Sequence, residues 1–143
     1  MKTVKQLLDL KGHDVWSIDP DDAVFDAIQV MADRNVGALV VIKNDKLVGI
    51  ISERDYARKV ILADKSSHKT QVREIMTANV ICGQPEQTID ECMAVMTEKR
   101  MRHLPILLEK KLVGMITLGD VVKSIIEDQE HEIEELYHYI HTA

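Results

Sequence analysis

This chain of 143 residues contains few aromatic residues and few cysteines. It has one Phe, one Trp and three Tyr, so aliphatic side chains and methionine must fill its interior. Its two cysteines, Cys82 and Cys92, form no CxxC pattern. We therefore expect thiols buried in a reducing cytoplasm, and neither a disulfide nor a cysteine-bound metal.

Long apolar runs and an excess of positive charge are also missing. No stretch approaches the roughly 20 apolar residues of a membrane span, and residues 1–6 lack a signal-peptide core. The net charge of −6 argues against a surface that follows the phosphates of DNA or RNA. We therefore expect a cytoplasmic protein with no membrane or nucleic-acid partner, whose 45% of hydrophobic residues is enough for a core.

The sequence repeats itself at an offset of 65 residues. Val15, Pro20, Met31, Leu39, Lys46, Leu47, Val48, Gly49, Ile51 and Asp55 recur as Val80, Pro85, Met96, Leu104, Lys111, Leu112, Val113, Gly114, Ile116 and Asp120. A period of this length predicts two copies of one supersecondary unit. The cleft between the copies is the first place where we expect a site.

Each repeat predicts the order strand, helix, strand, strand, helix. In the first repeat the strands are expected at 15–18, 38–42 and 47–51, and the second helix at about 52–62. The first helices carry matching apolar faces, formed by Val24, Ala27, Ile28 and Met31 and by Ile89, Cys92, Met93 and Met96. Glycine in the middle of a strand, at Gly49 and Gly114, predicts a close approach by another group.

These patterns predict an α/β (α+β) fold of two tandem β-α-β-β-α repeats with a C-terminal helix extension. We expect repeat 1 at 1–63, a polar linker at 64–71, repeat 2 at 72–127 and the terminal helix at 128–143. That helix continues an apolar pattern from Val121 to Ile140, so either its own domain or a second subunit must cover it. Its histidines, His131, His138 and His141, lack a further ligand, and we expect no metal site.

Several motifs resemble those of the CBS domain, and the whole chain resembles a tandem CBS pair. They are Lys-Leu-Val-Gly-(Ile/Met)-Ile-(Ser/Thr)-x-x-Asp in both repeats and Arg102-His103-Leu104-Pro105-Ile106 before the second hairpin. The resemblance implies two repeats packed about a pseudo-twofold axis, with clefts that commonly bind AMP, ADP, ATP or NAD. It also implies a regulatory module without catalytic activity, and often a homodimer.

The Ser/Thr-x-x-Asp motif is the constellation most suited to bind such a nucleotide. An Asp at the start of a helix can accept both ribose hydroxyls, while the Ser or Thr and the helix N–H groups meet a phosphate. The alternative is a helix N-cap with an acidic first turn. The candidate ribose- and phosphate-binding residues are Ser52, Arg54, Asp55, Thr117, Asp120, Arg102 and His103.

The resemblance further implies crossed sites that combine the two repeats. Ser52 and Asp55 would face Thr77, Val80, Met101, Arg102 and His103, while Thr117 and Asp120 would face Val15, Val36, Gly37 and Ala38. Because Arg102 and Arg54 add positive charge on the first side, we expect the Asp55 cleft to be the better phosphate site. Arg102 can also be read as a solvated charge at a helix end.

The leading hypothesis is a non-catalytic sensor of adenine nucleotides that acts on an unknown effector protein. No P-loop, catalytic triad or metal triad stands out, which argues against an enzyme. The alternative is an interaction scaffold whose clefts bind no nucleotide.

Overall fold

The computed structural model describes residues 2–142, which form two compact units. The first unit is the continuous segment 14–81. The second unit combines residues 2–13 with residues 82–142. The units therefore do not coincide with the expected segments 1–63 and 72–127, because a short piece of each repeat packs with the other repeat.

The first unit is built on a three-stranded sheet, in the order β1-β2-β3. Strand β1 (Ser17–Ile18) is parallel to β2 (Ala38–Lys43), which pairs antiparallel with β3 (Lys46–Ser52). Helix α2 (Val24–Arg34) buries Val24, Ala27 and Met31, three of the four residues expected on its apolar face. The fourth, Ile28, is half-buried and packs against the same core.

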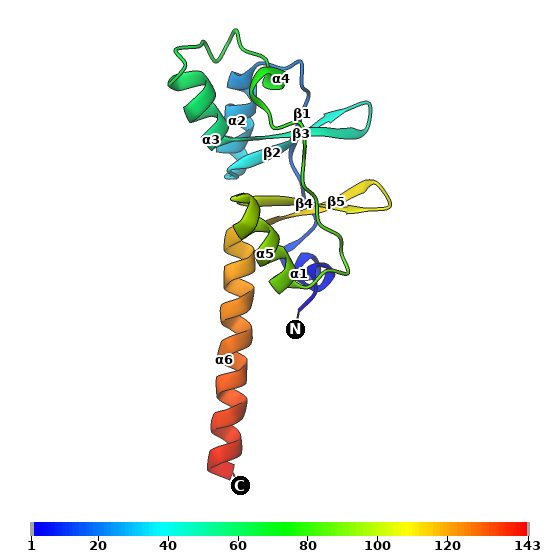
Figure 1. Ribbon diagram of the computed structural model, residues 1–143, viewed down its shortest axis with the longest axis vertical. Coiled ribbons are helices and arrows are strands. Elements are labelled where there is room, and N and C mark those ends of the chain that lie inside the picture. Colours follow the sequence, from blue (N-terminus) through cyan, green and yellow to red (C-terminus); the bar gives the residue numbers. More distant parts are fainter. Residues whose placement is uncertain (1, 143) are drawn as a thin grey trace. The chain divides into compact units, whose positions relative to one another are not determined.

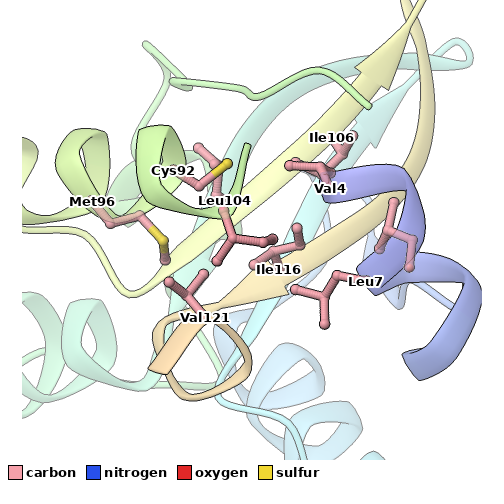
Figure 2. Packing of buried hydrophobic residues seen from close by; sticks show 10 residues of the cluster. Val4, Leu7, Cys92, Met96, Leu104, Ile106, Ile116 and Val121 are labelled. Atoms are coloured by element: carbon pink, nitrogen blue, oxygen red, sulfur yellow. The ribbon is translucent and has the colours of Figure 1, made fainter. Parts of the chain in front are cut away.

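The second unit repeats this plan with a two-stranded sheet. Strand β4 (His103–Leu108) pairs antiparallel with β5 (Lys111–Thr117), and helix α5 (Ile89–Lys99) covers them. Figure 2 shows the core, in which residues from α1 (Val4–Lys11), α5, both strands and α6 (Leu118–Thr142) meet. Its labelled members are Val4, Leu7, Cys92, Met96, Leu104, Ile106, Ile116 and Val121.

The 65-residue repeat is visible in backbone detail as well as in the order of the elements. Helices α2 and α5 both end on a left-handed residue, Asn35 at φ 55° and Arg100 at φ 54°. Both hairpins shift register at equivalent positions, between Val41 and Ile42 and between Ile106 and Leu107. The predicted α/β architecture of two repeats is therefore confirmed.

A short segment of each repeat packs with the other repeat, and each of these segments contains a short helix that the sequence analysis did not predict. In the first unit, α4 (Val72–Ile75) docks through Arg73 N–H, which donates to Pro20 O at 2.9 Å. In the second unit, α1 docks in the same way, since Lys5 N–H donates to Pro85 O at 2.9 Å. The buried residues of the two short helices also correspond, because Val4 of α1 and Val72 of α4 are both fully buried.

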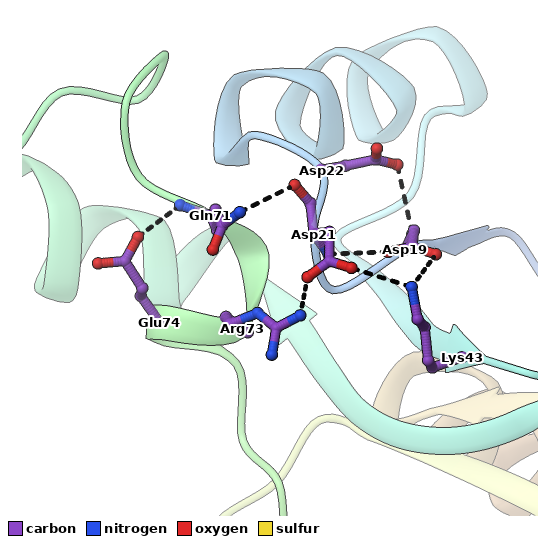
Figure 3. A network of polar contacts seen from close by, with 7 residues as sticks. All are labelled: Asp19, Asp21, Asp22, Lys43, Gln71, Arg73 and Glu74. Carbon is purple, nitrogen blue, oxygen red and sulfur yellow. Dashed lines mark hydrogen bonds and ion pairs between the residues drawn. The ribbon is translucent and has the colours of Figure 1, made fainter.

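Polar contacts reinforce the docking of α4, as Figure 3 shows. Asp21 forms ion pairs with Arg73 and with Lys43, whose Nζ lies 2.9 Å from Asp21 Oδ2. Glu74 accepts a hydrogen bond from Gln71 N–H at 2.7 Å and so caps the helix. Thr70, in the expected linker, is buried and its carbonyl accepts a hydrogen bond from Val24 N–H.

Three other elements differ from the expectation. Strand β1 has two residues, and its counterpart in repeat 2 is only a bridge between Gly83 and Ile106. The second helix of repeat 1 is α3 (Glu53–Tyr56) followed by the π-helical turn η1 (Ala57–Ile61). The second helix of repeat 2 and the expected terminal helix at 128–143 are one element, because α6 runs without a break from Leu118 to Thr142.

The sulfur-containing residues and Trp16 lie in or beside the two cores. Met96 is buried in the core of the second unit, against which Met93 and Met101 are half-buried, and Met76 is half-buried against the core of the first unit. Trp16 is half-buried, with the Arg34 guanidinium 4.0 Å from its ring centroid. Burial raises the pKa of Cys82, and burial with the charge of Glu91 raises the pKa of Cys92 to about 11. Both thiols are therefore protonated near neutral pH.

Among the described residues, no helix is both long enough and apolar enough to cross a membrane.

Candidate functional site

The first predicted motif, at 52–55, lies where β3 passes into α3. Ser52 is the N-cap, and its Oγ accepts a hydrogen bond from Asp55 N–H at 3.2 Å. Asp55 returns the contact, since its Oδ2 accepts from Ser52 N–H at 3.0 Å and from Ser52 Oγ at 3.1 Å. This reciprocal capping holds the Asp55 carboxylate at the start of the helix, with its side chain 16% exposed.

A lysine pairs with this carboxylate, and two backbone segments bond to the residues beside it in the chain. Lys59 Nζ lies 3.2 Å from Asp55 Oδ1 and donates to Ile75 O at 2.9 Å. Gly37 O accepts from the first amide of α3, and Ala38 pairs with Ser52 across the sheet. Thr77 exchanges both backbone hydrogen bonds with Ile50, two residues before Ser52. The junction that carries Asp55 is therefore fixed from both sides, and its direct cationic partner is Lys59.

The second motif, at 117–120, has the same geometry at the junction of β5 and α6. Asp120 Oδ2 accepts from Thr117 N–H at 2.9 Å, and Thr117 Oγ1 accepts from Asp120 N–H at 3.1 Å. Here the neighbouring cation is Lys11, whose Nζ donates both to Asp120 Oδ2 and, at 2.8 Å, to Met115 O. The two carboxylates are thus positioned alike but are paired with lysines from different parts of the chain.

Lys11 decides the ionisation of Asp120. Burial alone would raise the pKa of this carboxyl, but the hydrogen bonds from Lys11 and Thr117 and the Lys11 charge outweigh it. The pKa of Asp120 is therefore lowered, and the group is a carboxylate at neutral pH. It keeps its charge although it is half-buried.

Arg102 and His103 lie beside the second motif. Arg102 O accepts a hydrogen bond from Leu118 N–H at 2.9 Å, and His103 pairs with Thr117 across the sheet. Burial lowers the pKa of His103, and the positive charges of Lys11 and Arg102 lower it further, against a smaller opposite effect of Asp120. His103 is therefore neutral near pH 7.

The remaining predicted residues divide between the units. The first unit contains Val15, Val36 and Val80, which are half-buried. It also contains Gly37, Ala38, Thr77, Ser52 and Asp55. Met101 lies in the second unit, with Arg102, His103, Thr117 and Asp120. Arg54 and Arg102 are exposed. The crossed arrangement, in which each motif faces residues of the other unit, stays a prediction.

Lys11 and His13 are the neighbours that the sequence analysis missed. His13 Nδ1 lies 2.9 Å from Val113 O, and its Nε2 lies 3.1 Å from Asp9 Oδ1. The hydrogen bond to Val113 O and the one to Asp9 raise the pKa of His13. No local signal marks either residue, because their partners in β5 and α6 are about a hundred positions away in sequence.

The described residues contain no cluster of three or more His, Cys, Asp or Glu that could hold a metal ion. A hollow of the second unit is lined by Lys2, Gln6, Asp9, Leu10 and Asp128 and contains no residue of the Thr117–Asp120 motif.

Comparison with known proteins relates the chain to one family throughout. The family model described as CBS domain matches residues 7–62 and again residues 72–127. The mitochondrial CBS domain-containing protein CBSX3 of Arabidopsis thaliana is 42% identical over 125 residues, which are 84% of this chain and 61% of that protein. The chain thus spans less than two thirds of this relative.

Two solved structures extend the likeness to the fold. A putative signal-transduction protein with CBS domains from Burkholderia ambifaria is 51% identical, with a TM-score of 0.86, covering 90% of this chain and 96% of that one. The CBS domain pair of protein MJ0100 was crystallised with 5'-methylthioadenosine and S-adenosyl-L-methionine. It is 25% identical, with a TM-score of 0.76, covering 87% and 99% of the two chains.

CBS-domain pairs are regulatory modules, and some of them bind adenosine ligands. Three findings point to the same family: both units share one sheet-and-helix plan, each holds an Asp at a helix start next to a Ser or Thr, and the family model matches both repeats. The chain therefore belongs to the CBS-domain family, as a tandem pair of CBS domains.

Proposed function

We propose that this CBS pair is a regulatory module that binds an adenosine-containing nucleotide (AMP, ADP, ATP or NAD) without converting it. Asp55 and Asp120 would accept hydrogen bonds from the ribose hydroxyls. The observation that carries the proposal is the recurrence, in both units, of a half-buried carboxylate fixed at a helix start by a Ser or Thr.

The charges around each carboxylate support this ligand class. An ionised carboxylate is the strongest acceptor that a side chain offers to a pair of hydroxyls. Lys59 beside Asp55 and Lys11 beside Asp120 each place an ammonium group where phosphate oxygens could be bound. The adenosine ligands that were crystallised with the CBS pair of MJ0100 support the same class.

Lys11 changes the expected ranking of the two motifs. From sequence, the arginines favour the Asp55 side for phosphate. The Asp120 side has its own ammonium group, so we propose that both motifs can serve a phosphate-bearing ligand. We further propose that the module is a homodimer and that the regulated effector is a separate protein.

Titration calorimetry with AMP, ATP and NAD tests the proposal. We expect at least one of them to bind the wild-type chain. Asp55→Asn or Asp120→Asn should weaken that binding by about 10- to 100-fold, because each removes the charge from an acceptor but keeps its shape. Asp45→Asn is the matched control, since Asp45 is exposed in the hairpin turn and has a left-handed φ of 61° that Asn also adopts.

A scaffold without a nucleotide is the second candidate, favoured by the fact that caps and lysines already occupy both carboxylates. Under this alternative none of the three nucleotides gives heat or raises the melting temperature. Equal binding by the wild type and both Asp→Asn variants would also contradict the proposed role of the carboxylates.

A further inference from the structure

The last part of α6 has no covering layer within its own unit. Val121 and Ser124 face the core of the second unit, but every residue from Gln129 to His141 is exposed. Figure 1 shows the helix, in orange and red, continuing well past α1 and α5 of the same unit. Ile133, Leu136 and Ile140 are 68%, 60% and 63% exposed, which is far above the usual exposure of such side chains.

These apolar residues follow a heptad pattern. One line along the helix, at alternating steps of four and three, consists of Val122, Ile126, Gln129, Ile133, Leu136 and Ile140. Three isoleucines occupy one core position of the heptad (a), while Val122, Gln129 and Leu136 occupy the other (d). β-Branched residues at a are typical of parallel two-stranded coiled coils, and Leu136 at d agrees with that pattern.

No charged residue lies on the line itself. Glu127, Asp128, Glu134 and Glu135 lie on the opposite side of the helix, and His131 Nε2 pairs there with Glu135 at 2.9 Å. An apolar line this narrow is suited to pairing with another helix and is narrower than the stripe by which a helix packs onto a domain.

The charges beside the line distinguish the two possible orientations of an identical partner. In the antiparallel register that overlaps the whole line, Glu130 faces Glu130 and Glu132 faces Glu132 of the second copy. In the parallel register, Glu132 lies next to Tyr137 and Glu130 lies next to Ile125. Since like charges at these flanking positions oppose pairing, the parallel orientation is favoured.

The apolar area on this helix suits a specific contact. Exposed apolar side chains along and beside the line include Ile126, Ile133, Leu136, Tyr137, Tyr139 and Ile140. Stable specific interfaces begin at about 1,200 Å² of total buried surface, and these side chains in two copies, each about half to three-quarters exposed, offer apolar surface on that order.

We propose that two copies of this chain associate through α6, pairing the Val122–Ile140 line as a parallel two-stranded coiled coil. The inference names the surface of the proposed homodimer and does not depend on nucleotide binding. The contact lies on the terminal helix, and its apolar line begins at Val122, two residues after Asp120.

Sedimentation equilibrium of the full chain tests the surface. We expect the wild type to have twice the mass of one chain. Ile133→Glu should raise the dissociation constant at least about a hundredfold, because pairing would bury a charge. His131→Glu, which adds the same charge on the outer side, should leave the dimer intact. A monomeric wild type, or an Ile133→Glu variant as dimeric as the wild type, would overturn the proposal.

Cross-linking tests the orientation. In a Cys82→Ser background, Leu136→Cys should form a disulfide-linked dimer on oxidation, since equal positions meet in a parallel pair. Antiparallel pairing would instead place residue 136 against residue 126. If Leu136→Cys alone fails to cross-link, and a mixture with Ile126→Cys chains succeeds, the parallel coiled coil is wrong.

Discussion

Lys11 controls two titratable groups of the second unit. Its ammonium donates to Asp120 Oδ2 and its charge also acts on His103. Replacement by Met removes that charge from a half-buried place, so we expect the pKa of both Asp120 and His103 to rise. Side-chain NMR titration would measure the two shifts. Lys11→Arg, which keeps the charge, is the control, and an unchanged His103 titration in Lys11→Met would contradict the assignment.

The same two groups link the stability of the second unit to pH. Folding lowers the pKa of each, so protonation of either group opposes the folded state. The His103 contribution is complete above its unfolded value of 6.5 and is lost as the pH falls through the lower folded pKa. The Asp120 contribution is lost in the same way below 3.8. On acidification the contributions of these two groups are therefore lost in two stages, whereas the raised pKa of His13 in the same unit acts in the opposite direction.

Helix α1 offers a matched pair of leucines at the scale of one element. Leu8 is 1% exposed and Leu10 is 73% exposed on the same eight-residue helix. We expect Leu8→Ala to lower the free energy of unfolding by about 2–5 kcal/mol, because it leaves a cavity over β5. Leu10→Ala should change it by less than about 0.5 kcal/mol. Urea unfolding would measure both, and equal effects would show that α1 is not docked as described.

Elements that show a periodic pattern of apolar residues were predictable from the sequence. The buried faces of α2 and α5 follow from apolar spacing, and so do the two hairpins. The close approach expected at the mid-strand glycines is also found. A Cβ at Gly114 would lie 2.7 Å from Leu8 Cδ2, and one at Gly49 would lie 3.1 Å from Thr77 O.

Elements that are too short to show a period, or that are held by residues far away in sequence, were not predictable. Helix α4 has four residues, too few to show a period, and α1 contacts strands that lie about a hundred residues further along the chain. For the same reason the Ser/Thr-x-x-Asp motifs could be placed at helix starts, whereas the pairing of Asp120 with Lys11 could not. Local signals specify caps and faces but not which distant cation reaches a carboxylate.

At the scale of the whole molecule, residues 2–13 belong to the unit of 82–142 although they precede 14–81 in sequence, and this gives a test of the two units. Deleting residues 2–13 removes Val4, Leu7 and Leu8 from the core of the second unit. We expect amide hydrogen exchange to lose protection at 82–142, while 14–81, next to the deletion in sequence, stays protected. A loss of protection confined to 14–81 would contradict the division into these two units.

The packing of residues 2–13 with residues 82–142 also sets an order of assembly. The segment 14–81 is continuous, so all of its partners have been synthesised once residue 81 has left the ribosome. Residues 2–13 are made before 14–81, yet the strands and helices that bury them come from 82 onward. This segment must therefore wait, with Leu7 and Leu8 uncovered, while the whole of 14–81 and then its own partners are synthesised. During synthesis, residues 2–13 are thus uncovered for longer than any part of the first unit, and a chaperone that binds apolar segments would protect them.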